Sequence, residues 1–222
     1  MWFYHQVVTL KIIYEDNHLL VLEKPENMPM QADESGDLDL LTQAKKYLKE
    51  KYQKPGNVYL GLVHRLDRPV GGVCVFAKTS KAASRLSKQI SEHVFNKEYL
   101  AVVIDNDLKN EDTFNDKLLK DHKTNMVKVD KNGKESTLSY KVLKKNNGLA
   151  LVHVFLKTGR SHQIRVQFAS RGHALYGDQR YNRQAKSGQQ IALHAYKISF
   201  KHPVTNETME FISPIDRYPF SL

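Results

Sequence analysis

The chain has 222 residues, 41% of them hydrophobic and 26% charged, and no apolar run approaches the roughly 20 residues of a membrane-spanning helix, so a globular protein is expected. The N-terminal residues do not resemble a signal peptide, and the one cysteine, Cys74, excludes an intramolecular disulfide, which together favour a reducing, cytoplasmic location. Lys and Arg (34) outnumber Asp and Glu (24), and the net charge of +10 favours an anionic partner, with nucleic acid ahead of a membrane surface.

The N-terminal part of the chain is predicted to contain three strands and one helix. Apolar runs bounded by turn residues indicate the strands, and apolar residues at helical spacing after Asp39 indicate the helix. In chain order, the expected elements are a strand over 7–13, a strand over 19–23, an acidic loop over 33–37, a helix over 39–52 and a strand over 58–63.

A loop that carries Asp67 separates the strand over 58–63 from a further predicted strand over 73–77. Arg65 and Arg68 flank this carboxylate in the sequence. Because nearby positive charge lowers the pKa of a carboxyl group, Asp67 is expected to stay ionised at neutral pH. It is therefore a candidate nucleophile or general base, and the alternative is a structural Asp–Arg pair that caps the loop.

The rest of the chain alternates predicted helices with hairpins. The expected elements are a helix over 80–94 capped by Thr79 or Ser80, a break over 96–98, a strand over 99–104, a hairpin of 138–143 and 149–156, a helix over 162–171 and a hairpin of 196–200 and 209–212. Ser161 is predicted to cap the second helix and Gly172 to end it. The polar segment 105–135 is expected to be a solvated loop with short strands, and the alternative is a mobile insertion whose basic residues bind phosphates.

Strands outnumber helices and hairpins dominate, so the predicted fold is α+β, with a large mixed, mainly antiparallel sheet flanked by helices and loops. No linker composition divides the sequence, and residues 1–222 are expected to form a single domain. The sequence contains no coiled-coil seam, so a monomer that requires no protein partner is expected.

Metal and nucleotide-cofactor sites find little support in the sequence. The histidines considered as metal ligands have neither the i, i+4 spacing nor the cysteine pairs of strong metal motifs; they are His64, His162, His173 and His194. A nucleophile elbow, a phosphate-binding loop and a dinucleotide fingerprint are all missing. What remains is a loop carboxylate, several arginines and a tyrosine, which suit chemistry at a nucleotide sugar.

Four segments in order resemble the RluA-type pseudouridine synthases. They are Lys24-Pro25 with Met28-Pro29; His64-Arg65-Leu66-Asp67-Arg68-Pro69-Val70-Gly71-Gly72; Lys97-Glu98-Tyr99; and Thr158-Gly159-Arg160-Ser161-His162-Gln163-Ile164-Arg165, followed by Gly172-His173 and Gly177-Asp178. The resemblance covers residues 11–200 and rests on the order of several motifs, each of which is weak alone.

The resemblance implies that uridine in RNA, either rRNA or tRNA, is converted to pseudouridine without a metal or cofactor. The N1–C1′ bond is cleaved, the base rotates and it is rejoined through C5. Asp67 would be the essential carboxylate, acting at the ribose C1′ or through a glycal, and Arg165 would pair with it. Tyr99 would stack on the flipped base, and Arg65 would fill the place that the base vacates or contact the phosphate backbone.

Four further residues are expected to bind RNA: His64, Arg68, Arg160 and His162. Structural alternatives stay open for several positions. His64 can form hydrogen bonds that hold the loop. Arg160 and His162 can form only hydrogen bonds within their turn, and Tyr99 can be a half-buried core aromatic.

Two features depart from the family pattern. Many members have Thr-Ser-Gly or Val-Ser-Gly where this chain has Val70-Gly71-Gly72, so a hydroxyl is lost from the loop. Many also carry an N-terminal S4-like RNA-binding domain, and here the first predicted strand begins too close to Met1 to leave room for one. Two other functions remain as alternatives, namely a non-catalytic RNA-binding or ribosome-assembly protein that kept the fold and a metal-dependent RNA hydrolase.

Overall fold

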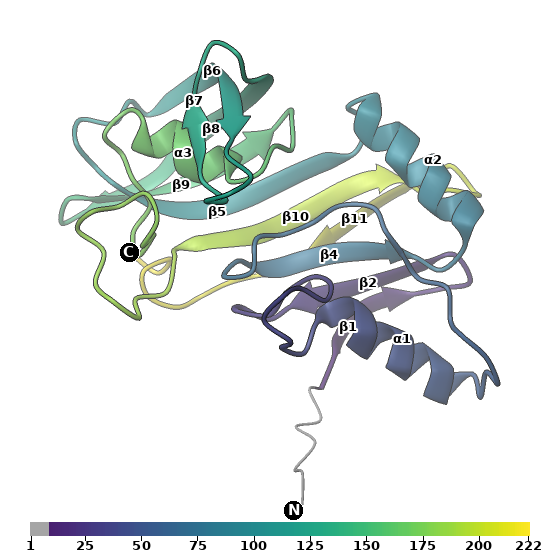
Figure 1. The fold of residues 1–222 in the computed structure, drawn as a ribbon. Helices are drawn as coiled ribbons and strands as arrows, with labels where there is room; N and C mark the ends of the chain where they lie inside the picture. Colours follow the sequence, from purple (N-terminus) through teal and green to yellow (C-terminus); the bar gives the residue numbers. More distant parts are fainter. Residues whose placement is uncertain (1–8) are drawn as a thin grey trace, which may run out of the picture.

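The computed structural model describes residues 9–222, which form one sheet of 11 strands and three helices (Figure 1). The helices are α1 (Leu40–Lys51), α2 (Ser80–Ser91) and α3 (Gln163–Ala169). The strands are β1 (Lys11–Glu15), β2 (Leu19–Lys24), β3 (Gly61–Leu62), β4 (Gly71–Ala77), β5 (Asn96–Ile104), β6 (Glu111–Lys120), β7 (Val127–Val129), β8 (Lys134–Asn146), β9 (Leu149–Leu156), β10 (Leu193–Lys201) and β11 (Thr208–Ile212).

The main path of the sheet runs β1-β2-β4-β10-β5-β9-β8-β6-β7, with β3 beside β4 and β11 beside β10. The β4–β10 pair is parallel. The other strand pairs are antiparallel. The α+β fold with a mixed, mainly antiparallel sheet is therefore confirmed.

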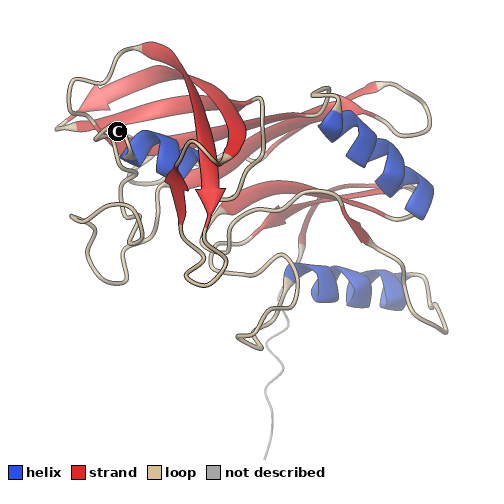
Figure 2. Cartoon of the chain, turned by 45° about the horizontal axis from the view of Figure 1, so that its top comes forward, coloured by secondary structure: helices blue, strands red, loops and turns tan. Residues whose placement is uncertain are grey.

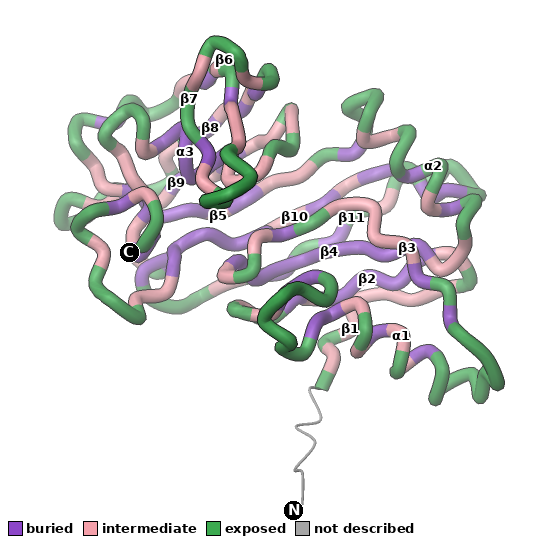
Figure 3. Tube along the Cα trace, viewed as in Figure 1, coloured by how far each residue is buried: buried purple, intermediate pink, exposed green. Residues whose placement is uncertain are grey.

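Helices α1 and α2 cover opposite faces of the sheet, because successive side chains of a strand point to opposite faces. Leu20 of β2 packs into the same core cluster as Leu40 of α1. Its neighbour Val21 packs on the other face, in the cluster that contains Leu86 of α2. Figure 2 shows the two helices on either side of the strands, and Figure 3 shows the buried residues that run along the central strands.

Helix α3 lies in the curved half of the sheet, beside β6 and β7, on the face that α1 covers at the other end (Figure 1). Ile164 and Phe168 of α3 are buried in the cluster that also contains the α1 side chains. The Phe168 ring lies 5.1 Å from the rings of Phe114 and Tyr140. The α1 and α3 halves therefore share one core, and the loop between β3 and β4 lies between them.

The predicted positions of helices α1 and α2 and of the hairpins β8–β9 and β10–β11 are confirmed. Asp39 caps α1 by accepting a hydrogen bond from the Thr42 amide, and Thr79 caps α2 in the same way. The β8–β9 turn places Asn147 and Gly148 at φ of 49° and 74°, which is the backbone that an Asn-Gly hairpin turn uses.

Several predicted boundaries were wrong. The strand expected over 7–13 corresponds to β1, which begins at Lys11 and continues to Glu15. Residues 7 and 8 of the predicted strand lie outside the described part of the chain. In the stretch 58–63, strand pairing is confined to Gly61–Leu62. The break expected over 96–98 belongs to β5 instead, because backbone pairing with β9 and β10 continues through these polar residues.

The prediction for the segment 105–135 was only partly right, because it contains the expected short strand β7 but also the ten-residue strand β6. Only Phe114 and Leu118 of β6 are buried, so the apolar pattern of this strand is weak. The last residues of the helices predicted over 39–52 and 80–94 are exposed, Tyr52 by 45% and Val94 by 43%. Both lie beyond the last residue of their helices.

Helix α3 is shorter than predicted and begins differently. Its N-cap residue is His162, in a left-handed backbone conformation and without a side-chain capping bond, so Ser161 is not the cap. Gly172 does adopt a left-handed conformation after the helix, with φ of 83°, as predicted.

Candidate active site

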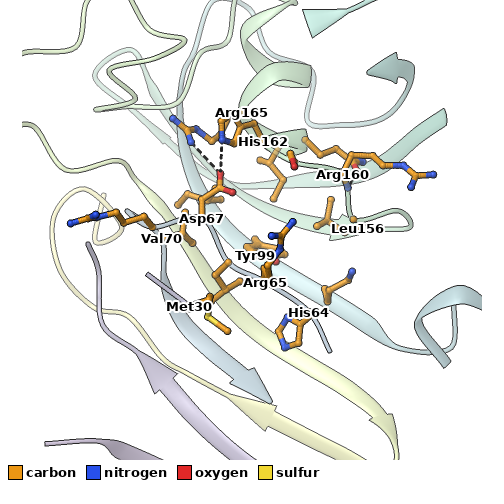
Figure 4. Close-up of a pocket in the computed structure, with 18 of the residues that line it drawn as sticks. Met30, His64, Arg65, Asp67, Val70, Tyr99, Leu156, Arg160, His162 and Arg165 are labelled. Atoms are coloured by element: carbon orange, nitrogen blue, oxygen red, sulfur yellow. Dashed lines mark hydrogen bonds and ion pairs between the residues drawn. The ribbon is translucent and has the colours of Figure 1, made fainter. Parts of the chain in front are cut away.

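Asp67 lies on the loop between β3 and β4, at a cleft of about 1000 Å³. Side chains from the loop, from β5 and from the start of α3 line this cleft together. Figure 4 shows Asp67 beside Arg165 and His162, with Tyr99 and Arg65 on the other side of the opening. The topology thus brings to one place residues that are far apart in the sequence.

The buried Lys24 holds the Asp67 loop in place. Its ammonium group donates hydrogen bonds to the carbonyl oxygens of Pro25 at 2.9 Å, Met28 at 2.6 Å and Arg68 at 3.0 Å. The side chain therefore ties the segment after β2 to the residue that follows Asp67. Burial lowers the pKa of Lys24 to about 8.

Gly71 and Gly72 are the first residues of β4 after this loop, and the structure gives a reason for both. Gly72 has φ of 118°, and a Cβ atom there would lie 2.2 Å from the Ala195 carbonyl oxygen. A Cβ at position 71 would lie 3.0 Å from the Glu26 side chain. Close approach of β4 to β10 therefore requires glycine at 72, whereas the fit at 71 is tight against a side chain that can move.

Arg165 joins Asp67 to a second carboxylate, Asp178. Its Nη1 atom donates to Asp67 Oδ2 at 3.1 Å, while Nε and Nη2 donate to Asp178 at 2.8 and 2.7 Å. The Arg165 side chain is only 5% exposed. Burial alone would lower the pKa of Arg165, but the hydrogen bonds and charge of Asp178, followed by those of Asp67, outweigh it and raise the pKa.

His162 faces the same carboxylate from the start of α3. Its Nε2 atom lies 3.9 Å from Asp67 Oδ2, and its Nδ1 atom lies 2.8 Å from the hydroxyl of Tyr181. Burial lowers the pKa of His162, and the positive charges of Arg165 and Arg180 add to this effect although Asp67 opposes it. His162 is thus neutral at pH 7 and belongs to the surroundings of Asp67 more than to an exposed RNA surface.

Tyr99 and Arg65 line the cleft without bonding to Asp67. Tyr99 is only 8% exposed, and it both lines the cleft and packs in the hydrophobic core. Burial, with the charge of Asp67, raises the pKa of the Tyr99 hydroxyl, which is protonated at neutral pH. Arg65 is exposed at the mouth of the cleft.

The structure places three residues expected to bind RNA in distinct settings. His64 accepts a hydrogen bond from the Val75 amide through Nε2 at 3.1 Å, and burial lowers its pKa to about 3. Arg68 is exposed and pairs with Asp33 and Asp37 of the acidic loop. The Arg160 guanidinium is also exposed and donates one hydrogen bond, from Nε to the Glu135 carbonyl at 3.1 Å.

Sequence reasoning assigned no role to three residues of this site. Asp178 fell within a quoted motif, and a glycine-aspartate pair after the Arg165 helix was its only signal. Lys24 gave a similar signal as part of a lysine-proline pair. Tyr181 gave none, because its contacts come from segments that meet only in the folded chain.

Residues 9–222 contain no group of three or more His, Cys, Asp or Glu side chains placed to hold a metal ion. Within the same residues, none of the helices has the length and apolar character that crossing a membrane requires.

Comparisons with known proteins agree on one family. The profile of the RNA pseudouridylate synthase family matches residues 18–170. Ribosomal large subunit pseudouridine synthase C of Buchnera aphidicola subsp. Schizaphis graminum is 32% identical over 93% of this chain and 68% of its own length. The protein of the same name from Vibrio parahaemolyticus is 35% identical over 92% of this chain and 65% of its own. The chain thus spans about two thirds of the length of these relatives.

Solved structures show the same fold. Human RNA pseudouridylate synthase domain containing 1 superposes with a TM-score of 0.76 at 24% identity, covering 95% of this chain and 85% of that one. Human RNA pseudouridylate synthase domain containing 4 gives 0.79 at 19% identity, covering 95% and 90%. The profile match over most of the chain, with relatives more than 30% identical, shows that the chain belongs to the RNA pseudouridylate synthase family.

Proposed function

We propose that this chain isomerises uridine in RNA to pseudouridine, with Asp67 acting at the ribose C1′. The observation that carries the proposal is the Asp67–Arg165 ion pair, 3.1 Å long and open to the cleft. All the hydrogen bonds and ion pairs between Asp67 and the described side chains use Oδ2. The other oxygen, Oδ1, is therefore available to a substrate.

The carboxylate suits either route to cleavage of the N1–C1′ bond. Asp67 can attack C1′, or it can remove a ribose proton so that a glycal forms as the base departs. In both routes the base must stay in the cleft while it rotates and presents C5. Arg165, fixed by Asp178, keeps the carboxylate in one orientation throughout.

Tyr99 suits the role of a stacking surface for the uracil. The residue lines the same cleft, and base–aromatic stacking contributes about 1–3 kcal/mol. The hydroxyl keeps its proton at neutral pH, because burial raises its pKa. Tyr99 therefore offers a ring surface to the base and is poorly suited to accept the C5 proton.

The RNA is proposed to be ribosomal, with a flexible or single-stranded target. The net charge of +10 favours a polyanion, and flipping a base costs least where stacking is weak. Relatives at 32–36% identity are named ribosomal large subunit pseudouridine synthases, which favours rRNA over tRNA. We further propose that the protein acts in the cytoplasm as a monomer and that it requires no protein partner.

Release of tritium from RNA labelled at C5 of uridine tests this function. The wild-type protein should release tritium without cutting the RNA chain, and a chelator should not change the rate. Asp67→Asn should release none while still binding RNA. Asp107→Asn, a change at an exposed carboxylate that does not line the cleft, is the matched control and should retain activity.

Each alternative predicts a different result. A non-catalytic RNA-binding protein would release no tritium in its wild-type form. A metal-dependent hydrolase would cut the RNA and would stop when a chelator is added. Normal release from Asp67→Asn would contradict the role proposed for this carboxylate.

A further inference from the structure

Tyr181 connects three parts of the molecule through one side chain. It lies in the loop between α3 and β10, and its hydroxyl contacts both β7 and His162. We propose that Tyr181 is a positioning residue that holds His162 in one tautomer beside Asp67. The same side chain links this arrangement to the position of the β6–β7 hairpin. The inference rests on the proposed function in taking Asp67 as the catalytic carboxylate.

The contacts around Tyr181 favour one direction for the hydrogen bond between its hydroxyl and His162. The Val127 amide donates to the Tyr181 oxygen at 3.0 Å, so the phenol is the acceptor in that bond. The phenol has a single hydrogen, and His162 Nδ1 lies 2.8 Å from the same oxygen. Burial raises the pKa of Tyr181, so the phenol keeps this hydrogen at neutral pH. The negative charge of Asp67 on the Nε2 side of the imidazole favours a hydrogen on Nε2, so Nδ1 is the acceptor of the phenol hydrogen.

This bond determines which nitrogen of His162 carries the proton. A neutral imidazole whose Nδ1 accepts a hydrogen bond must carry its hydrogen on Nε2. Nε2 is the atom that faces Asp67, at 3.9 Å from Oδ2. This separation is too long for a direct hydrogen bond, so the N–H group acts on the carboxylate as a nearby dipole.

The backbone of His162 shows why its side chain needs support. Its φ of 51° lies in the left-handed region, which costs a non-glycine residue roughly 1–2 kcal/mol. No side-chain capping bond is present at this helix start. The Tyr181 ring packs edge-on against the imidazole with 5.7 Å between centroids, and the Arg165 guanidinium lies 5.2 Å above the Tyr181 ring.

The link to the hairpin begins at Val127, the first residue of β7. Val127 pairs with Lys120 of β6, and the turn between them carries Asn125. Both Lys120 and Asn125 line the cleft that holds Asp67. Arg180, the neighbour of Tyr181, donates a second hydrogen bond to this turn, to the Asn125 carbonyl at 3.2 Å. RNA that fixes the position of the hairpin therefore also fixes the position of Tyr181.

Tyr181→Phe separates the hydroxyl from the ring. Phenylalanine keeps the ring that packs against Arg165 and His162 but can neither donate to Nδ1 nor accept from Val127. Tyr140→Phe is the matched control. Tyr140 is buried, and its hydroxyl donates a hydrogen bond to the Lys109 carbonyl at 3.2 Å, which the change to phenylalanine removes. Thermal unfolding of both variants shows whether each remains folded.

Nitrogen-15 NMR of the histidine rings reports the tautomer directly and needs no RNA. The wild-type protein should show His162 with its hydrogen on Nε2, and Tyr181→Phe should show a mixture of the two tautomers. The Val127 amide should exchange with solvent faster in the same variant. An unchanged tautomer or unchanged exchange in Tyr181→Phe would overturn the proposal, whatever the activity of the wild-type protein.

Kinetics test whether Tyr181 acts through His162. The single-turnover rate of tritium release should fall about ten-fold in Tyr181→Phe, as expected for the loss of one hydrogen bond, and should stay near the wild-type rate in Tyr140→Phe. His162→Asn is the second variant, since asparagine tolerates a positive φ. Adding Tyr181→Phe to His162→Asn should lower the rate little further. Fully multiplicative losses, or equal losses in both tyrosine variants, would overturn the proposal.

Discussion

Asp178 holds Arg165 by two parallel hydrogen bonds, at 2.8 Å to Nε and 2.7 Å to Nη2. The Asp178 side chain is completely buried, so this pair is shielded from water. A bidentate pair fixes the plane of the guanidinium as well as its position. The orientation in which Arg165 meets Asp67 is therefore set by Asp178, which lies on the far side of the guanidinium from the substrate cleft.

Asp178→Asn should lower the free energy of unfolding by on the order of 3 kcal/mol, because a buried arginine loses the full charge of its main partner. The rate of tritium release should fall as well, since Arg165 can then tilt away from Asp67. RNA affinity should change much less, because Asp178 itself does not line the cleft. Urea unfolding at pH 7, the tritium assay and RNA titration measure the three quantities.

Asp112→Asn provides the control for this change. Asp112 pairs with Lys109 on the exposed surface of β6, where water and salt screen the interaction. The unfolding free energy of the Asp112→Asn variant and its rate of tritium release should stay close to those of the wild-type protein. Equal stability of the Asp178 and Asp112 variants would show that the buried pair does not fix Arg165.

Gly72→Ala should destabilise the protein severely, because its new Cβ would lie 2.2 Å from the Ala195 carbonyl oxygen. A backbone atom cannot move aside without breaking the pairing of β4 with β10. Gly36→Ala is the control, since Gly36 also has a positive φ but a methyl group added there would meet nothing within 4 Å. The control should lose only about 1 kcal/mol from backbone strain, and thermal unfolding compares the two. Similar losses would show that the close approach at β10 is unimportant.

The fold was largely predictable where one face of an element is buried and the other is not. Helices α1 and α2 follow from the helical spacing of their apolar residues, and the start of α2 follows from its capping residue Thr79. The β6–β7 hairpin was not predictable, because its solvated strands carry few apolar side chains in alternation. Its backbone bonds to β8, which no pattern within the segment itself reveals.

The candidate site was predictable only as far as local motifs reach. Asp67 could be singled out because it interrupts an apolar run between two arginines. Charge close in the sequence indicated Arg65 and Arg68 as its partners. The family resemblance instead indicated Arg165, 98 positions away, and this is the pair that the fold contains. The anchoring by Asp178 and Tyr181 depends on tertiary contacts that spacing along the chain does not encode.

Lys24 should give the protein a distinctive dependence of stability on pH. Burial lowers its pKa to about 8 in the folded chain, against about 10.4 when unfolded. Between these values the unfolded chain binds more protons, so the contribution of Lys24 to stability rises with pH, by up to about 1.4 kcal/mol per unit. Below pH 8 the contribution is constant.

Comparison with Lys24→Met isolates this contribution. The difference in unfolding free energy between wild type and variant, measured in urea from pH 7 to pH 10, should shift in favour of the wild type as the pH rises. Lys88→Met, on the exposed side of α2, should give a difference that does not vary with pH. A constant difference for Lys24→Met as well would mean that its ammonium group is not desolvated.

Arg160 and His64 should differ in their effect on RNA binding, because only one of them carries charge. Arg160→Gln should reduce the slope of log affinity against log salt by roughly 0.7–0.9, the value for one lost phosphate contact. His64→Gln should leave the slope unchanged, because burial holds the pKa of His64 at about 3 and its Nε2 atom accepts from the Val75 amide. Titration of RNA at several salt concentrations, with Asp67→Asn as the background to prevent turnover, measures both slopes. A reduced slope for His64→Gln would show that this histidine is charged in the complex, and an unchanged slope for Arg160→Gln would remove Arg160 from the phosphate-binding surface.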